Sequence, residues 1–580
     1  ETVELPELEE QAESDSKLFV EHSDDYLLSL GVPQDWLFVL RKIVTEDDLL
    51  SVVTKLPEEV AERLLGVAAG ELVTPPAPVA KKTPLEQNPD NLRRFWVVEN
   101  AEELRNVLER PIEDWVRFLH PSQRALVTKE FNGPSKVSGA AGTGKTVVGL
   151  HRARSLASKG KRVLLTSFVT TLCRNMEHNI HVLCSQSQLE FQEQIKDRIT
   201  VSTVHKLALK LAKQINSRIT IISDGDIAKL IKRRHAGGGF LFDTGFLESE
   251  WNAVIEPQGI TTWAEYRKAR RTGRGKPLTV KQRKDCWTVF NGVLEDLHAA
   301  EKCSWSGICR FALQGLEDGT VASPFDAVIV DEVQDLKAQE LKLLAALTKD
   351  NPGNLMLLGD AGQRIYPGGF SLSKLGINVR GRSHILRINY RTTEQIRRFA
   401  DQLLSSESDD LDEGSEQRNS RSLLKGPAPE LRGFKTQPLQ DQFIIEQIQR
   451  TLSEGIQPQA IAVFARSKTQ LKETEKALRA SDIPVFEIES DVDLSTSAGI
   501  NLTTMHRAKG LEFKVVFVIN CSNEIVPHRN ALSKLHDAGD YDAGMERERQ
   551  LLYVAVTRAR DEAFITWVGE RSEFLNSSSQ

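Results

Sequence analysis

Short apolar runs that end in polar residues recur along most of this chain. One of them, Phe325–Leu336, reads F-D-A-V-I-V-D-E-V-Q-D-L, and segments with apolar residues at helical spacing, such as Val147–Leu156, lie between such runs. Continuous runs of β-branched and other apolar residues are typical of parallel strands that are covered on both faces. We therefore expect an α/β fold with parallel sheets. Strands are predicted within residues 135–138, 162–168, 199–205, 325–336, 354–360, 460–464, 485–488, 500–503 and 515–519.

The first 70 residues have a different pattern, which predicts a small acidic helical module over residues 1–73. Ser23 can cap one helix, and Thr45 with Asp48 resembles a capping box at the start of another. Residues 74–92 are rich in proline, which predicts an extended linker. We expect the module to serve packing or docking, without chemistry of its own.

Charge is distributed unevenly over the 580 residues. Residues 1–71 hold 18 acidic and 5 basic side chains, and the remainder holds 63 acidic and 70 basic ones, so that the net charge is −6. A mildly basic body suits a nucleic-acid partner, and an acidic front end could compete for the same basic groove.

One stretch, residues 266–284, contains nine basic residues and no acidic one. Phosphate neutralisation requires such clusters, so Arg267, Arg270 and Arg271 are candidate contacts to nucleic acid. A solvated basic face is the alternative interpretation.

The chain contains no run of 18 apolar residues, no recognisable secretory leader and no C-x-x-C pair among its six cysteines. This composition predicts no membrane span, no zinc site and no disulfide framework. We expect a protein of the reducing cytoplasm.

Residues 139–146 read G-A-A-G-T-G-K-T and have the spacing of a phosphate-binding loop. The glycines let backbone N–H groups point at phosphate oxygens, Lys145 adds positive charge, and the Thr146 hydroxyl can bind Mg²⁺. A helix directly after the loop would present its N-terminus to the anion. The candidate nucleotide-binding residues here are Gly139, Ala140, Ala141, Gly142, Thr143, Gly144, Lys145 and Thr146.

Two carboxylates follow the apolar run of residues 325–330. Asp331 and Glu332 would lie at the carboxyl end of a parallel strand, where α/β sheets bind their ligands. Asp331 is a candidate for holding Mg²⁺, and Glu332 for activating an attacking water. Together with the phosphate loop, this pair predicts a nucleoside triphosphate hydrolase. Upstream, the Gln123 amide has the donor and acceptor that match an adenine edge.

Nine motifs follow one another along the chain. They are Gln123, G-A-A-G-T-G-K-T (139–146), T-S-F-V-T-T (166–171), S-T-V-H (202–205), D-E-V-Q-D (331–335), G-D-A-G-Q-R-I-Y (359–366), N-Y-R-T-T (389–393), T-M-H-R-A-K-G-L-E-F (504–513) and L-L-Y-V-A-V-T-R-A-R (551–560). Their order resembles superfamily 1 helicases of the UvrD/Rep/PcrA type over about residues 115–570. The resemblance implies two RecA-like domains with ATP in the cleft between them.

The resemblance also implies roles for single residues at the nucleotide. Tyr390 would stack on adenine, Gln363 would sense the γ-phosphate, and Glu512 would touch the ribose. Arg391 and Arg558 would act as arginine fingers from the second domain. Such fingers suit phosphoryl transfer because charge spreads over the equatorial oxygens in its transition state.

For nucleic acid, the resemblance implies a track for single-stranded DNA that uses sequence-tolerant stacking. Where the family continues the Gln363 motif with R-W, this chain has Pro367 and Gly368, so Phe370 is the candidate substitute for the stacking Trp. Core packing is the alternative for Phe168 and His205. The candidate contacts in these motifs are Phe168, Thr170, Thr203, His205, Phe370, Thr504 and His506.

The domain boundaries follow from the same resemblance. The first RecA-like domain is predicted at residues 93–205 and 301–385, around a mostly helical basic insertion at 206–300. The second is predicted at 386–404 and 430–570. Residues 405–429 form an acidic polar loop where the family usually has a large insertion that touches the duplex, so translocation is better supported than vigorous unwinding.

The leading hypothesis is an ATP- and Mg²⁺-dependent translocase that moves 3′→5′ along single-stranded DNA, with some helicase activity. One alternative is a nucleic-acid-sensing regulatory or defence ATPase that gates a protein partner through the N-terminal module. Another is action on RNA, because stacking and phosphate contacts do not separate the two nucleic acids.

Overall fold

The computed structural model of this chain describes residues 18–20, 22–32, 34–53, 56, 58–68, 73, 75, 119, 121–184, 195–271, 277–365, 371–404, 420–488, 498–533 and 538–578. Contacts divide the chain into two compact units. One comprises Glu1–Arg110 and His120–Ser122, and the other comprises Pro111–Leu119 and Gln123–Gln580. The predicted Pro-rich linker lies outside the described residues except for Pro75.

The first unit is a small helical bundle, as its sequence pattern predicts. Its elements are α1 (Asp24–Ser29), η2 (Gln34–Trp36), α2 (Leu37–Leu40), α3 (Glu46–Val53) and α4 (Glu58–Ala68). The Ser23 hydroxyl accepts from Tyr26 N, which caps α1. Thr45 and Asp48 form a reciprocal capping box, in which each side chain accepts from the other's backbone N–H at 3.1 Å.

The second unit contains two parallel sheets of six strands each. The first sheet has the strand order β3-β2-β6-β7-β1-β8. Its strands are β1 (Ser135–Gly139), β2 (Val163–Ser167), β3 (Ile199–Thr203), β6 (Ala327–Val330), β7 (Leu355–Gly359) and β8 (Ser383–Leu386). Because all these strands are parallel, the residues that follow β1, β2, β3, β6 and β7 meet at one edge of the sheet.

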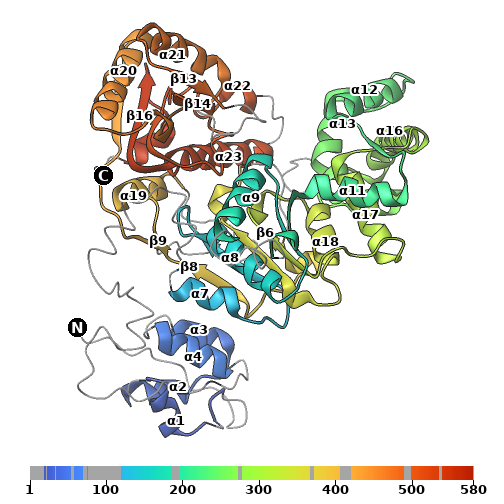
Figure 1. The fold of residues 1–580 in the computed structure, drawn as a ribbon. Helices are drawn as coiled ribbons and strands as arrows, with labels where there is room; N and C mark the ends of the chain where they lie inside the picture. Colours follow the sequence, from blue (N-terminus) through green and yellow to red (C-terminus); the bar gives the residue numbers. More distant parts are fainter. Residues whose placement is uncertain are drawn as a thin grey trace. The chain divides into compact units, whose positions relative to one another are not determined.

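Helices cover both faces of the first sheet (Figure 1). On β6, Ala327 and Ile329 pack toward α8 (Lys145–Ser158) and α9 (Thr170–Cys184). Val328 and Val330 pack in the opposite core, which also contains side chains of α11 (Val204–Ile215), α17 (Trp305–Glu317) and α18 (Ala338–Ala346). The strand is apolar on both faces for this reason.

A mostly helical insertion separates β3 from β6, as predicted. Its elements are β4 (Thr220–Ile221), α12 (Asp224–His235), α13 (Thr244–Glu250), the π-helical turn η5 (Trp251–Ile255), α14 (Glu256–Gln258), α15 (Trp263–Lys268), α16 (Val280–Ala299) and β5 (Lys302–Cys303). Trp251, Tyr266 and Phe290 are fully buried in its own core. The aromatic residues near the basic stretch therefore include core residues rather than an open stacking surface.

The second sheet has the order β11-β16-β15-β12-β14-β13, again with parallel neighbours only. Its strands are β11 (Glu430–Phe434), β12 (Ile461–Ala465), β13 (Val485–Glu487), β14 (Ile500–Thr504), β15 (Phe513–Val518) and β16 (Ala559–Val568). Helices α19 (Glu394–Leu403) and α23 (Ala538–Val556) pack on one face, and α20 (Gln437–Ser453) and α21 (Lys468–Ala480) on the other. The two sheets have the architecture of two RecA-like domains, as predicted.

Of the strands in the two six-stranded sheets, the sequence analysis missed β8, β11 and β16. The segment predicted as a polar loop at 405–429 contains a strand near its end, β10 (Arg421–Ser422), which pairs with β9 (Ile388–Asn389). Residues 405–419 lie outside the described part. No helix among the described residues combines the length and apolar character needed to cross a membrane.

Candidate nucleotide and nucleic-acid site

The phosphate loop connects β1 to α8 and is tightly packed. Gly142 and Gly144 both have a φ of +83°, a conformation that favours glycine. A Cβ added to Gly142 would overlap Asn389 Oδ1, and one added to Gly144 would lie 2.6 Å from Gln123 Nε2. Both glycines are therefore required by their backbone conformation and by their neighbours.

The buried Lys145 side chain is hydrogen-bonded to the backbone of the phosphate loop. Its ammonium donates to the carbonyl oxygens of Gly139 at 2.6 Å and Ala140 at 3.1 Å. Burial lowers the pKa of Lys145, while the carboxylates of Asp360 and Glu332 act in the opposite direction. A phosphate group that enters the loop would replace two carbonyls as the partner of this cation.

Thr146 and Asp331 meet beside the loop, as the motifs predict. The Thr146 hydroxyl donates to Asp331 Oδ2 at 2.7 Å, and Asp331 Oδ1 accepts from the Glu332 N–H at 3.0 Å. Burial and the adjacent Glu332 charge raise the pKa of Asp331 to about 6. Two hard oxygen donors at a phosphate site fit Mg²⁺, which typically binds one or two protein ligands with phosphates and waters.

Glu332 lies at the end of β6 in a left-handed conformation, with a φ of +54°. Non-glycine residues adopt this strained region rarely, and such residues concentrate at functional sites. Its carboxylate accepts a hydrogen bond from Gln334 and lies 3.5 Å from the Lys509 ammonium. Burial raises the pKa of Glu332, but Lys509, Lys145 and Arg558 more than offset that effect, so its pKa lies below the ordinary value.

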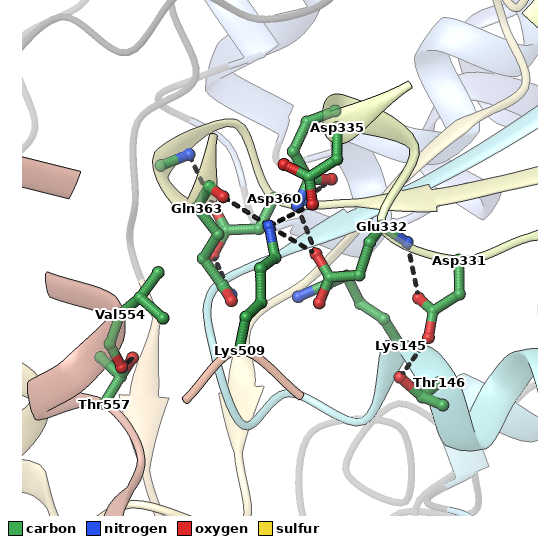
Figure 2. Close-up of polar contacts among 12 residues, drawn as sticks. Lys145, Thr146, Asp331, Glu332, Asp335, Asp360, Gln363, Lys509, Val554 and Thr557 are labelled. Atoms are coloured by element: carbon green, nitrogen blue, oxygen red, sulfur yellow. Dashed lines mark hydrogen bonds and ion pairs between the residues drawn. The ribbon is translucent and has the colours of Figure 1, made fainter. Parts of the chain in front are cut away.

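Lys509 reaches this carboxylate from the second sheet, where it follows β14 (Figure 2). It is 2% exposed, lies 2.5 Å from Asp335 Oδ2 and donates to the Gln363 carbonyl at 2.6 Å. Burial raises the pKa of Asp335 to about 6. Opposite charges from the two sheets are thus paired away from water.

Gln363 is a second connection between the sheets. Its amide nitrogen donates to Asp360 Oδ2 at 2.8 Å, and its amide oxygen accepts from Arg558 Nη2 at 3.2 Å. Arg558 is buried between α23 and β16, and burial lowers its pKa. The structure therefore brings Lys145, Glu332, Gln363 and Arg558 into one site.

The residues predicted for adenine, ribose and the second arginine finger lie around the same loop. Gln123 is buried, and its amide donates to Thr143 O at 2.9 Å. Tyr390 donates its backbone N–H to Gly142 O at 3.0 Å, and burial raises the pKa of its hydroxyl. Arg391 forms an ion pair with Glu512 of the second half.

Aromatic side chains gather at the ends of β2 and β3. Phe168 meets the His205 ring edge-on at a centroid distance of 5.5 Å, and His205 stacks on Trp305 at 4.6 Å. His205 Nε2 lies 2.8 Å from a carboxylate oxygen of Glu340, a buried residue. Trp305 is 36% exposed, so the aromatic row formed by Phe168, His205 and Trp305 reaches solvent. Sequence analysis missed Trp305, which carries no motif.

The remaining residues that were predicted to contact nucleic acid lie in different environments. Thr170 is exposed at the start of α9, whereas the Thr203 hydroxyl caps α11 by accepting from Lys206 N at 3.3 Å. Thr504 ends β14, and burial lowers the pKa of the nearby His506 to about 4. Phe370 lies outside the described residues.

The basic stretch is corrected by the structure at one position. Arg267 and Arg270 are exposed, as a phosphate contact requires. Arg271 is not available: its side chain is 6% exposed and forms a bidentate pair with the buried Glu250, at 2.7 Å from Nε and 2.9 Å from Nη2. Arg271 stabilises the insertion, and the prediction that it contacts nucleic acid is wrong.

Replacing Arg271 with methionine is expected to destabilise the insertion by about 3–5 kcal/mol, because Glu250 would be left buried without its cation. Denaturant unfolding would measure the loss. The matched change at the exposed neighbour, Arg270→Met, should have an effect below about 0.5 kcal/mol. Equal stabilities for the two variants would contradict the buried pair.

Several residues of the site were missed by sequence analysis, namely Asp335, Asp360, Asn389 and Lys509. All four lie inside or next to the quoted motifs, so the motifs were the available signal. No group of three or more His, Cys, Asp or Glu residues in the described part is arranged to hold a metal ion. Thr146 and Asp331 supply two donors, one of them a hydroxyl, so they do not form such a group.

Two parallel sheets with one phosphate loop, and with cations from the second sheet directed at it, define the class of two-domain P-loop ATPases. Residues 119–374 match the family model of the UvrD/REP helicase N-terminal domain. Residues 384–494 and 486–570 match that of the UvrD-like helicase C-terminal domain. This chain belongs to the UvrD/Rep/PcrA type of superfamily 1 helicases.

Relatives with similar sequences are DNA helicases by name. A "Probable DNA helicase" of Mycoplasma pneumoniae is 26% identical over 489 residues, which cover 79% of this chain and 84% of that protein. The "ATP-dependent DNA helicase UvrD2" of Mycobacterium tuberculosis is 22% identical over 554 residues, with coverages of 76% and 77%. The "ATP-dependent DNA helicase PcrA" of Staphylococcus epidermidis is 40% identical over 95 residues, which cover 16% of this chain and 12% of that protein.

Proposed function

We propose that this chain is an ATP-dependent DNA helicase that translocates along single-stranded DNA in the 3′→5′ direction. The observation that carries the proposal is the junction of the two sheets, where Arg558 and Lys509 of the second meet Gln363 and Glu332 of the first. Hydrolysis at such a junction can open and close the two domains once per ATP. Relatives named as DNA helicases support DNA as the track, and favour it over an RNA-directed enzyme or a regulatory ATPase.

The residues of the loop would bind the triphosphate. Lys145 would exchange the carbonyls of Gly139 and Ala140 for phosphate oxygens, and Thr146 with Asp331 would hold Mg²⁺. When bound, Mg²⁺ neutralises charge that develops on the phosphate oxygens. Glu332 would accept a proton from the attacking water, a role that suits a carboxylate whose pKa is held low enough to stay ionised.

The second half would supply charge to the transition state. Arg558 already contacts Gln363, and Arg391 is held beside Glu512, so closure of the two halves would direct both guanidinium groups at the γ-phosphate. The need for these cations would couple hydrolysis to closure. Repeated closure would then advance a strand that stacks on sequence-tolerant aromatic surfaces.

The proposal is tested by steady-state ATPase measurements without nucleic acid and with single-stranded DNA, duplex DNA or single-stranded RNA. Stimulation by single-stranded DNA above the other polymers is the expected result. Directional displacement of streptavidin from the 5′ or 3′ end of a biotinylated strand then tests polarity. ATPase activity that no nucleic acid changes would overturn the motor assignment, and stimulation by RNA alone would overturn DNA as the track.

Replacing Trp305 with alanine is expected to weaken binding of single-stranded DNA by about 10-fold, because one stacked base contributes ~1–3 kcal/mol. Fluorescence anisotropy with a labelled oligonucleotide measures the effect. Trp305→Phe should retain most of the affinity, and Phe38→Ala, at an exposed aromatic residue of the N-terminal module, should leave it unchanged. Unchanged affinity in Trp305→Ala would remove the aromatic row from the DNA track.

Charge reversal at Arg267 and Arg270 is expected to weaken nucleic-acid binding and to flatten its dependence on salt. Removing one phosphate-neutralising cation should lower the slope of log K against log salt by about 0.7 for single strands and 0.9 for duplex. A matched reversal at the exposed Lys472 and Lys476 of α21 is the control. The same slope in both variants would make the basic stretch a solvated face.

A further inference from the structure

The segment that joins the two sheets is bonded to the phosphate loop. After β8 ends at Leu386, the chain passes directly over the loop at Asn389 and Tyr390. Asn389 is 1% exposed, and its Nδ2 donates to Ala141 O at 2.8 Å. The backbone N–H of Tyr390 donates to Gly142 O at 3.0 Å. Two consecutive residues of the joining segment therefore hold two consecutive carbonyls of the loop.

The oxygen of the Asn389 side-chain amide accepts hydrogen bonds from the backbone that follows Tyr390. Asn389 Oδ1 accepts from the N–H groups of Arg391 at 2.9 Å and Thr392 at 3.0 Å. One residue further, Thr393 N donates to Arg560 O at 3.1 Å, in the strand β16 of the second sheet. Five residues thus connect the phosphate loop, the backbone of Arg391 and the second sheet through hydrogen bonds.

We propose that Asn389 is a positioning residue that links the conformation of the phosphate loop to the placement of Arg391. The inference rests on the proposed function, since it assigns Arg391 to the hydrolysis step. Nucleotide entry must change the loop, because Lys145 now holds the carbonyls of Gly139 and Ala140, which directly precede the carbonyl held by Asn389. A shift there is passed through one side-chain amide to the Arg391 N–H.

The hydrogen bonds of Asn389 leave little freedom for the phosphate loop and the joining segment to move independently of each other. The Asn389 amide makes three hydrogen bonds in a site that excludes water, and Gly142 approaches it so closely that a Cβ would overlap Oδ1. Loss of the amide would leave the Tyr390 N–H as the remaining bond to the loop, so that a shift of the loop would no longer be passed through a side chain to the Arg391 N–H. The defect should therefore appear in turnover rather than in ATP binding.

The test compares Asn389→Ala with Asn354→Ala in the full chain. Asn354 is a matched control: it is 7% exposed, its Nδ2 donates to Asp326 O at 2.8 Å, and it lies where β7 begins, at the opposite edge of the sheet from the phosphate loop. Asn389→Ala is expected to lower kcat of the DNA-stimulated ATPase by about 10- to 100-fold, the size of a small misplacement of a reacting group, with KM for ATP within about threefold. Asn354→Ala should retain kcat within about twofold.

A double-mutant cycle with Arg391→Ala separates positioning from general support of the fold. Where Arg391 is already absent, Asn389→Ala should lower kcat by less than about threefold. Asn389→Asp keeps the two acceptor contacts but removes the donor to Ala141 O, so it should lower kcat with the same dependence on Arg391. This variant keeps the test available should the alanine variant fail to fold.

The outcomes separate this inference from the proposed function. If the wild-type protein has no DNA-stimulated ATPase activity, the proposed function itself is overturned. If the unchanged protein is active, an unaffected kcat in Asn389→Ala or Asn389→Asp overturns the positioning role. An equal reduction with and without Arg391 overturns it as well, because Asn389 would then act independently of that arginine.

Discussion

Replacing Lys145 with alanine is expected to abolish ATP turnover, a loss on the order of 10³-fold or more. Lys145 is the cation inside the phosphate loop, and four other charged residues, Asp360, Glu332, Asp331 and Arg391, influence its pKa. Its removal would leave a buried site with three carboxylates and no loop cation, which disfavours a triphosphate. Both binding and the transition state should therefore suffer.

The Lys145 prediction is checked with ATPase kinetics and with the binding of a fluorescent ATP analogue. Lys159→Ala is the control, because Lys159 directly follows α8 and forms an exposed pair with Glu130 at 3.3 Å. Circular dichroism would establish that the variant is folded. Near-normal hydrolysis by a folded Lys145→Ala protein would show that the nucleotide site has been assigned to the wrong loop.

Replacing Glu332 with glutamine is expected to preserve ATP binding and to slow hydrolysis by about 10²–10⁴-fold, the usual contribution of a general base. Glutamine has the same shape and can occupy the same left-handed backbone, which is already strained at a φ of +54°. It can still contact Gln334, but it cannot accept a proton from water. Binding and turnover should therefore separate in this variant.

Single-turnover hydrolysis and ATP-analogue binding measure those two properties. Glu130→Gln, the acidic member of the exposed pair with Lys159, is the matched control. A Glu332→Gln protein that hydrolyses ATP within about fivefold of the unchanged protein would remove Glu332 from the role of base. Loss of ATP binding in the same variant would instead point to a structural role through Lys509.

Much of the fold was predictable because its signals are local. The apolar run before Asp331 reads as a strand that is buried on both faces, and it forms β6, the third strand in the order of the first sheet. The reciprocal hydrogen bonds of Thr45 and Asp48 were visible as a three-residue spacing. The phosphate loop and the carboxylate pair could be placed together because parallel strands bring their carboxyl ends to one edge.

Strands without such a signal were missed. β16 begins three residues after the end of the helix α23, within a single motif, and β8 alternates exposed residues with half-buried or buried ones at the margin of the first sheet. The basic stretch of residues 266–284 shows that sequence patterns also fail to tell exposed side chains from buried ones. Arg267, Arg270 and Arg271 look alike in sequence, and only the packing of Glu250 beneath Arg271 distinguishes a structural arginine from two exposed ones.

By itself, the sequence determined the class of chemistry: a phosphate loop, a strand that ends in two carboxylates and a series of motifs in one order. The tertiary structure alone decided which distant side chains share the site. Lys509 pairs with Asp335, Arg558 contacts Gln363, and Asn389 holds the phosphate loop, although more than 150 residues separate the members of each pair along the chain. The physical reason is that periodicity and spacing specify neighbours within a strand or helix, whereas contacts between sheets depend on how both cores pack.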